Sequence, residues 1–353
     1  MQGGNNLTES RSGAISSFSA STQMPIFDGF KIYNIIATAK LNLKAAVASL
    51  EKAKEDLAIN VASYFLDVLY YKEILSIAEL QVALTGEQVS KTEVLVNAGK
   101  IPTSQLYDIK AQLANDEVTL AEARNNVNLA LLNLAQALEL ERLGKDFDVS
   151  IPHVEDPVSE NLQSLLPPDF IYDKAVVVKP QIKEQEYLLE SQKRQLKVAQ
   201  ADYYPSLTLG GSLSSRYDKV FSGRTENEPV YSFGRQLNDN FQQVVGLSLS
   251  IPIFNRFRVR NNVRSARVDI INRELKMESS KKELYKEIQQ AYFSATAAQE
   301  KYIAAGKSAE ASKEAFVYAE ERYAAGKSTV FEYNESNTKY SQSLAEQAQS
   351  KYS

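Results

Sequence analysis

The chain has 353 residues, with 40 basic and 44 acidic side chains and a formal charge of −4. This near balance gives no reason to expect nucleic acid as a partner, because nucleic-acid-binding surfaces are basic. The absence of cysteine and the single histidine exclude disulfides, thiol catalysis and histidine-rich metal sites, and no cofactor or catalytic residue is expected. No apolar run reaches the roughly 18 residues of a transmembrane helix, and the first residues lack the charged and apolar regions of a signal peptide.

An internal duplication with an offset of 227 residues organises the chain. "MPIFDGF" at 24–30 recurs as "IPIFNRF" at 251–257, and "NAGK" at 97–100 recurs as "AAGK" at 324–327. In both copies the motif phenylalanine and the glycine lie 72 residues apart. The duplicated unit therefore has a fixed length between these two landmarks.

Long helices fill the interval between the landmarks. Over 31–97 and 256–323, apolar and small residues recur at steps of three and four, which is the pattern of coiled coils. A helix of about 67 residues would be about 100 Å long at about 1.5 Å per residue. Return helices are predicted over 103–142 and 328–353, each after a glycine that suits the left-handed end of a helix. Seams rich in Ala, Ser, Thr and Tyr favour a tube wall with neighbours on both flanks over an exposed coiled coil.

Three segments alternate with a period of two and are predicted to be strands: 14–26, 205–217 and 240–254. Each has an apolar face and a face of small polar residues, which is typical of membrane strands of about 9–11 residues. A soluble antiparallel sheet with one wet face is the alternative. The Ser, Gln and Thr side chains of the polar face, and the connection to long helices, favour membrane strands. The polar stretch 218–239 is then expected to be an extracellular loop.

These elements divide the chain into two repeats and a connector. The first repeat covers 1–142 and the second covers 169–353, which begins with a predicted helix over 169–202. Between them, 143–168 contains four prolines and is expected to wrap the outside of the tube as a belt. His153 lies in this connector and is expected to be a surface residue rather than a ligand.

The order of helix, strand, loop, strand, Pro-Ile-Phe motif, long helix, glycine tip and return helix resembles the TolC-like outer-membrane efflux protein family. The resemblance runs from about residue 14 to the end, and it rests on "MPIFDGFK", "IPIFNRFR", "VNAGKIPTSQLYD" and "RYAAGKSTVFEYNES". It implies a mainly α fold with membrane β-strands. In that fold, duplicated antiparallel helical hairpins form a trimeric periplasmic α-barrel joined to a twelve-stranded outer-membrane β-barrel.

The resemblance also implies a function and partners. It implies a homotrimer in contact with outer-membrane lipid, in a Gram-negative bacterium, extending into the periplasm. Such a trimer is a passive exit duct for small molecules or proteins in tripartite efflux or type I secretion. Its partners would be a periplasmic adaptor, or membrane fusion, protein and an inner-membrane pump.

The first repeat lacks counterparts of the helix and strand that open the second repeat. The chain is therefore expected to be a piece of a longer protein, without its signal sequence, the first helix and strand of repeat 1, and a C-terminal portion. Three of the four strands expected of each protomer are present.

By resemblance, the two helical tips are the sites at which an adaptor docks. The residues concerned are Ala98, Gly99, Lys100, Ile101, Pro102 and Thr103 in the first tip, and Ala325, Gly326, Lys327, Ser328 and Thr329 in the second. A small-residue turn lets another hairpin approach the backbone closely. A plain helix-hairpin turn is the alternative interpretation, and both roles are compatible.

The resemblance also implies an acidic constriction near the tips. Glu332 and Glu335 lie six and nine residues after the second glycine, so that a trimer would carry rings of three carboxylates that attract cations. The first repeat has Gln105 and Asp108 at these positions, which retains one acid. A solvated helix surface is the alternative for these side chains.

Tyr323 matches a family tyrosine that holds the closed gate, whereas Ser328 replaces the arginine of the family tip.

Two other functions are alternatives to the exit duct. One is a soluble coiled-coil scaffold. The other is an ATP-dependent enzyme that uses Gly326, Lys327 and Ser328, but a phosphate-binding loop needs a strand before it and a glycine at the position of Glu321.

Overall fold

The computed structural model describes residues 12–140, 147–150, 166–222 and 229–352. Contacts between residues divide the chain into two compact units. The sheet unit comprises residues 1–47 and 183–278, and the tip unit comprises 48–182 and 279–353. Within the described residues, no helix has an apolar stretch long enough to cross a membrane.

Two helices of equal length carry the duplication. Helix α1 (Lys31–Asn97) and helix α6 (Arg258–Ala324) each contain 67 residues. Both their first and their last residues are separated by the 227-residue offset of the sequence motifs. The duplicated pattern of small and apolar residues therefore yields helices with the same start, length and end.

Two consecutive residues with left-handed backbone precede each long helix. The φ angles are 66° and 63° at Gly29 and Phe30, and 53° and 63° at Arg256 and Phe257. Side chains disfavour this region, which explains why α6 begins two residues later than predicted. At Gly29 a side chain is also excluded by space, because a Cβ would lie 2.7 Å from the carbonyl oxygen of Ala201.

The Pro-Ile-Phe motifs make the same aromatic contact in both copies. Phe27 packs edge-to-face on Phe30 with ring centroids 5.6 Å apart, and Phe254 packs on Phe257 at 5.7 Å. In the first copy, the carboxylate of Asp28 also accepts hydrogen bonds from the N–H groups of the first turn of α1, at 3.1 and 2.8 Å. Such capping satisfies donors that have no partner within the helix.

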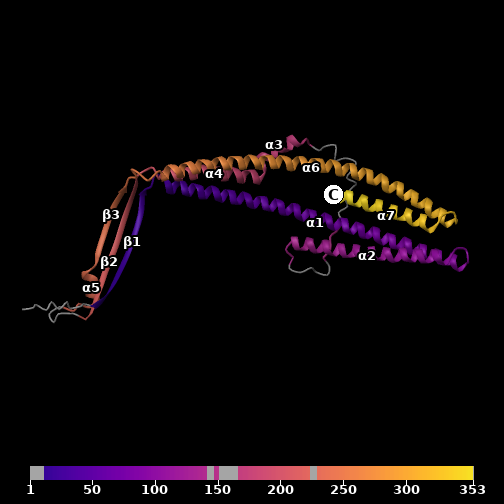
Figure 1. Ribbon diagram of the computed structural model, residues 1–353, viewed down its shortest axis with the longest axis horizontal. Coiled ribbons are helices and arrows are strands. Elements are labelled where there is room, and N and C mark those ends of the chain that lie inside the picture. Colours follow the sequence, from indigo (N-terminus) through magenta and orange to yellow (C-terminus); the bar gives the residue numbers. More distant parts are fainter. Residues whose placement is uncertain (1–11, 141–146, 151–165, 223–228, 353) are drawn as a thin grey trace, which may run out of the picture. The chain divides into compact units, whose positions relative to one another are not determined.

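The return helices are shorter than predicted. Helix α2 (Thr103–Ala137) ends five residues before the predicted position, because Leu138 leaves the helical backbone and Glu139 takes a left-handed φ of 55°. Helix α7 (Val330–Tyr352) begins two residues later than predicted. Figure 1 shows that each return helix follows a tight turn and runs back beside its long helix.

The single helix predicted over 169–202 is wrong. The structure has two helices, α3 (Pro168–Val178) and α4 (Pro180–Ala201). Lys179 between them is extended, with φ −60° and ψ 127°. Proline disfavours helical backbone at the residue before it and donates no hydrogen bond, so Pro180 ends one helix and begins the next. His153 and most of the predicted belt lie outside the described residues.

In the described part of the chain, the sheet has three antiparallel strands in the order β1-β2-β3: β1 (Ser12–Phe27), β2 (Ser206–Ser222) and β3 (Gln242–Ser250). Strand β2 continues five residues beyond its predicted end, and β3 is shorter than predicted at both ends. The stretch predicted as a loop contains the short helix α5 (Phe233–Asp239). This helix is held to the sheet by Phe233, whose ring contacts Phe18 and Tyr217.

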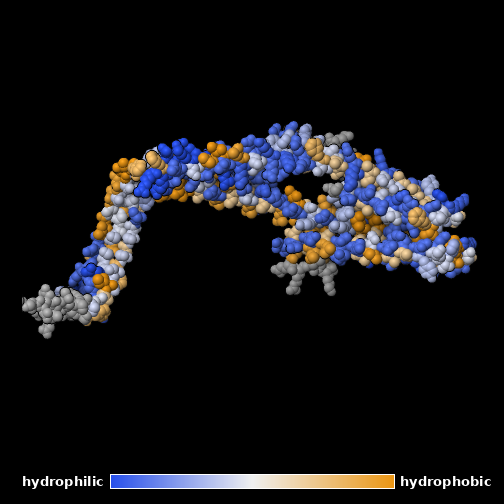
Figure 2. Space-filling view, viewed as in Figure 1, coloured by the Kyte–Doolittle hydropathy of each residue, from blue (hydrophilic) through white to orange (hydrophobic). Residues whose placement is uncertain are grey.

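The register gives the sheet two different faces. On one face, cross-strand rows align Phe27 with Leu207 and Leu249, and Met24 with Leu209 and Leu247. On the other face, rows align Gln23 with Gly210 and Gly246, and Ser19 with Ser214 and Gln242. The apolar row is open to its surroundings, since 64% of Leu247 is exposed. Figure 2 shows hydrophobic surface along one side of the sheet and weakly polar surface beside it.

The described residues of the tip unit form two buried clusters. One lies near the turns and draws on α1, α2, α6 and α7; its buried members are Leu106, Ile109, Phe316, Tyr323, Val330 and Tyr333. The other lies between α1 and α2; its buried members are Val68, Val127, Ala130, Leu131 and Leu134. The first cluster ties the ends of both hairpins into one packed bundle.

Candidate functional site

Both tips close with the same hydrogen bonds. The glycine N–H donates to the carbonyl three residues before it, at 2.9 Å for Gly99 and 2.9 Å for Gly326. The next N–H donates to the carbonyl five residues before it, at 2.9 Å for Lys100 and 2.8 Å for Lys327. This pair of bonds is the Schellman motif, and it places the glycines at φ 72° and 71°.

The tips present an open surface. All predicted docking residues are exposed except Ile101 and Ser328, which are half-buried. Apart from the directly adjoining chain, no described residue has an atom within 4 Å of the position that a Cβ would take at Gly99 or Gly326. The second tip is further ordered by Thr329, whose hydroxyl oxygen accepts a hydrogen bond from the N–H of Glu332 at 3.2 Å.

The structure places Tyr323 inside the bundle. Its ring packs 5.6 Å from that of Tyr333, and its hydroxyl lies 3.4 Å from that of Thr92 on α1. Tyr333 is only 2% exposed and also contacts Phe316. Burial raises the pKa of the Tyr333 phenol, with smaller contributions from nearby carboxylates, so this hydroxyl stays neutral. Tyr323 therefore links α6 to α1 as well as filling the core.

The predicted constriction residues lie on the surface of their helices. Glu332 is paired with Arg322 at 3.7 Å, and Glu335 with Lys339 at 2.7 Å. Because they are three residues apart on α7, the two glutamates share a helix face. Asp108 is exposed on α2, and among the described residues no hydrogen bond or ion pair joins it to either glutamate.

A buried polar network was not anticipated. The carboxylate of Asp116 on α2 accepts hydrogen bonds from the Thr85 hydroxyl at 2.6 Å and from the Gln112 amide at 2.8 Å. Gln81 donates to the same carboxylate at 3.5 Å and accepts from Ser341 of α7 at 2.7 Å. Three helices are thus joined below the tips.

A sequence signal for this network exists in the heptad pattern of α2. Buried residues recur every seven positions at Ile109, Asp116, Ala123 and Ala130. An aspartate in an otherwise apolar or small heptad position indicates a buried carboxylate that needs partners.

Two helical hairpins with long helices of equal length and with alike tips, attached to a sheet with an exposed apolar face, define the architecture of an outer-membrane channel protomer. The model of the family described as "Outer membrane efflux protein" matches residues 2–139 and 171–353. The chain belongs to this family, and its location is the outer membrane. The predicted fold class, mainly α with membrane β-strands, is confirmed: helices predominate, the strands form a small antiparallel sheet, and solved channel structures share this fold.

Known proteins resemble this chain over much of its length. The "Toxin and drug export protein A" of Aggregatibacter actinomycetemcomitans is 23% identical over 310 residues, which cover 86% of this chain and 62% of that protein. The "Outer membrane protein TolC" of Escherichia coli is 25% identical over 255 residues, 68% of this chain and 47% of that protein. The chain therefore spans less than two thirds of these relatives.

The fold itself is shared with a solved structure. CusC superposes with a TM-score of 0.76 at 15% identity, over 97% of this chain and 80% of that chain. At this identity the likeness shows the fold alone. None of these three proteins is named as an enzyme.

Proposed function

We propose that this chain is a protomer of a trimeric outer-membrane exit duct, through which small molecules or proteins leave the cell passively. The proposal rests on the two different faces of the sheet, found in a chain that belongs to the outer membrane efflux protein family. One face is apolar and exposed, as Leu247 and Val245 show with 64% and 81% exposure. The other face is small and polar. Lipid outside and water inside a barrel require this alternation.

Closure of the sheet supports a trimer. An open sheet edge leaves N–H and C=O groups without partners in a bilayer, which makes closure necessary. Rotational symmetry would close the sheet by pairing the edge strands of neighbouring protomers, and the four strands expected of each of three protomers would supply the twelve of the predicted barrel. The same symmetry arranges the helical hairpins as the wall of a tube.

The tips are proposed to dock on a periplasmic adaptor protein, which connects the duct to an inner-membrane pump. Their exposed backbone and the open space around Gly99 and Gly326 support this role, because a partner hairpin reaches the main chain without displacing side chains. Glu332 and Glu335 are proposed to line a constriction, together with Asp108. The packing of Tyr323 against α1 is proposed to keep the bundle closed.

A soluble coiled-coil scaffold is the second candidate. The regular seams of α1 and α6 favour it, but it leaves the exposed apolar face of the sheet without a function. A nucleotide site at Gly326, Lys327 and Ser328 is not favoured, because these residues follow a helix and complete its C-terminal cap.

The experiment is expression of the full-length protein in a bacterium that lacks its own exit duct but retains an adaptor and pump. The duct predicts recovery in the outer-membrane fraction, a trimer that dissociates only on heating in detergent, and restored efflux. Replacing Ala325 at the tip by tryptophan should abolish efflux but keep the trimer, whereas the same change at exposed Ala114 should keep both. Cytosolic recovery without a heat-modifiable trimer would contradict the duct and favour the scaffold.

A further inference from the structure

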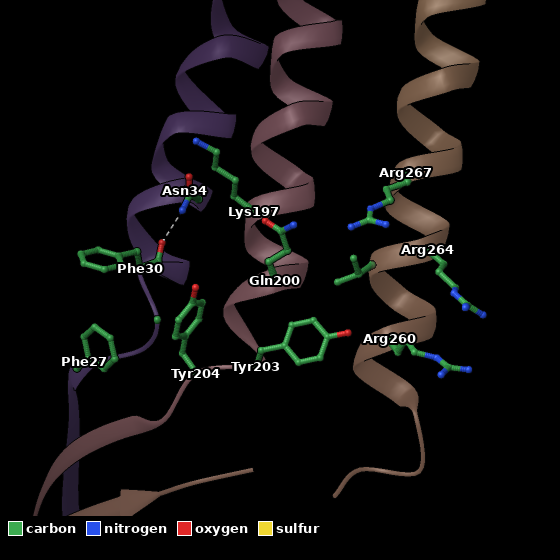
Figure 3. Close-up of a pocket in the computed structure, with 12 residues that line it drawn as sticks. Phe27, Phe30, Asn34, Lys197, Gln200, Tyr203, Tyr204, Arg260, Arg264 and Arg267 are labelled. Carbon is green, nitrogen blue, oxygen red and sulfur yellow. Dashed lines mark hydrogen bonds between the residues drawn. The ribbon is translucent and has the colours of Figure 1, made fainter. Parts of the chain in front are cut away.

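A cavity of about 740 Å³ lies in the sheet unit, where the strands give way to the helices. Helices α1, α4 and α6 contribute its lining (Figure 3). Four cationic side chains line it, and no acidic residue does so. Neither the tip docking nor the acidic constriction uses this cavity.

The cations come from two helices. Arg260, Arg264 and Arg267 are spaced by four and three residues, so they share one face of α6. Lys197 lies on α4. In Figure 3, the side chain of Arg267 points from α6 toward α4, whereas Arg260 and Arg264 extend outward from α6. The cavity therefore has one inward cation and a cationic outer edge.

None of these arginines is neutralised by an acid within the described residues. The recorded partner of Arg260 is the ring of Phe257, 4.8 Å from its guanidinium carbon, and Arg264 and Arg267 have no ion pair there. Like charges at such spacing repel one another along a helix. An anion bound among them would relieve this repulsion and form charge-assisted hydrogen bonds.

The cluster is not a by-product of the duplication. At the 227-residue offset, the first repeat has Tyr33, Ala37 and Lys40 in place of the three arginines. The strand-to-helix junction thus forms without this concentration of charge, which indicates a separate role in the second repeat.

An unpaired acceptor lies in the same cavity. Asn34 is 7% exposed, and its amide nitrogen donates to the carbonyl of Phe30 at 2.9 Å. That bond fixes the amide orientation and leaves Oδ1 buried without a hydrogen-bond partner. A ligand with a hydroxyl donor would satisfy it.

The aromatic residues of the cavity lining indicate a lipid as the ligand. Phe27, Phe30, Tyr203 and Tyr204 surround the cavity (Figure 3), as aromatic side chains do at membrane interfaces. Phe27 pairs with Leu207 and therefore belongs to the apolar face of the sheet. Acyl chains bound at the cavity would continue along that face.

We infer that this cavity, hereafter the junction pocket, binds the headgroup of an anionic glycerophospholipid, phosphatidylglycerol. Arg267 holds the phosphate and the outward Arg260 and Arg264 add positive charge at the edge of the cavity, while the glycerol hydroxyls donate to Asn34 Oδ1 and the acyl chains lie on the apolar strands. The inference rests on the proposed insertion of the sheet in a bilayer. Zwitterionic headgroups fit less well, because their ammonium group meets the same arginines.

The test measures binding of dihexanoyl phosphatidylglycerol to the purified full chain in amphipol, by equilibrium dialysis below the micelle concentration of the lipid. We expect binding at least tenfold tighter than that of dihexanoyl phosphatidylcholine. The double variant Arg264→Gln/Arg267→Gln should lose at least tenfold in affinity, and Lys197→Gln severalfold. Arg273→Gln, which removes the same charge from α6 outside the pocket, should bind as the unchanged chain does.

Three outcomes would overturn the inference. They are equal affinity for the two lipids, equal loss in Arg273→Gln and the double variant, and inorganic phosphate binding as tightly as the lipid, which marks a plain anion site. The substituted pocket side chains are exposed and Arg273 is half-buried, so each variant is first checked for the heat-modifiable trimer. Outer-membrane recovery of the unchanged chain separates failure of this inference from failure of the duct.

Discussion

At the scale of single residues, Asp116 is a buried carboxylate that depends on its neighbours for hydrogen bonds. None of the described residues forms an ion pair with it, and its hydrogen bonds reach Thr85, Gln112 and Gln81. A buried polar group is tolerable only when partners replace water. Because Gln81 also accepts a hydrogen bond from Ser341 of α7, the network connects α2 to α7 through α1.

Replacing Asp116 by alanine should destabilise the chain by roughly 1–3 kcal/mol, because it leaves the donors of buried Thr85 and half-buried Gln112 without this acceptor. The measurement is the free energy of unfolding in urea. Asp108→Ala is the matched control on the same helix, since Asp108 is exposed, and it should change stability by less than about 0.5 kcal/mol. Equal effects of the two substitutions would show that the network contributes nothing.

At the scale of helices, the tips are determined by backbone conformation rather than by side-chain packing. Gly99 and Gly326 have left-handed φ angles, and a Cβ at either would contact none of the described residues beyond the adjoining chain. Gly86 offers a contrast, because it lies within α1, where an added Cβ would likewise contact no described residue outside its own helix turn. The same residue type thus stabilises a helix end and weakens a helix interior.

Gly99→Ala and Gly326→Ala should each lower the free energy of unfolding by about 1 kcal/mol, because alanine disfavours left-handed backbone. Gly86→Ala should raise it by up to about 1 kcal/mol, because alanine favours helix more than glycine does. Urea titration of the three variants measures both signs. A destabilised Gly86→Ala would mean that this glycine serves a contact outside the single chain.

At the scale of the whole molecule, charge near the tips is expected to set ion preference. Glu332 and Glu335 each have a cationic partner, Arg322 and Lys339, so the net field of the proposed rings is smaller than six carboxylates would give. Exposed ion pairs are weak and rearrange easily. The balance between acid and base, rather than the acids alone, then decides selectivity.

The conductance of the channel in a lipid bilayer measures this balance. Low salt is needed because, at 0.1 M, dissolved ions already screen charges that lie more than about 10 Å apart. Glu332→Gln with Glu335→Gln should reduce the cation-over-anion permeability ratio severalfold, whereas Lys339→Gln should raise it. Glu346→Gln, an exposed change further along α7, should leave the ratio unchanged. The constriction hypothesis fails if the double variant conducts like the unchanged channel.

Much of the architecture was predictable because the duplication repeats both pattern and length. The period of the seams and the glycine at each tip located α1 and α6 to within two residues at each end. The alternation of β1, β2 and β3 predicted a two-faced sheet. The break at Pro180 was also readable, but the apolar periodicity on both sides of it masked the interruption. Helix α5 was missed because its sequence is polar and its anchor, Phe233, is a single residue.

The candidate site was less predictable, because it depends on which helix faces meet. The resemblance indicated Tyr323 as a gate residue, but its contact with Thr92 requires the packing of α6 on α1. Asp116 is hidden by a stronger apolar pattern in a neighbouring heptad register of α2, in which Leu106, Leu113 and Leu120 recur every seven residues. The arginines of the junction pocket were visible as a basic run. Their meaning came only from the cavity and from the unpaired oxygen of Asn34.

The equal lengths of α1 and α6 place the two tips at the same number of residues from the start of their helices. Removing seven residues from one helix alone would preserve its heptad seam yet withdraw its tip by about 10 Å, at about 1.5 Å per residue. Removing the matching seven from both would shorten the molecule while keeping its end level. If the proposed duct changes length in evolution, α1 and α6 are therefore expected to gain or lose the same number of heptads. A designed change of length must likewise remove or add matching residues in both helices.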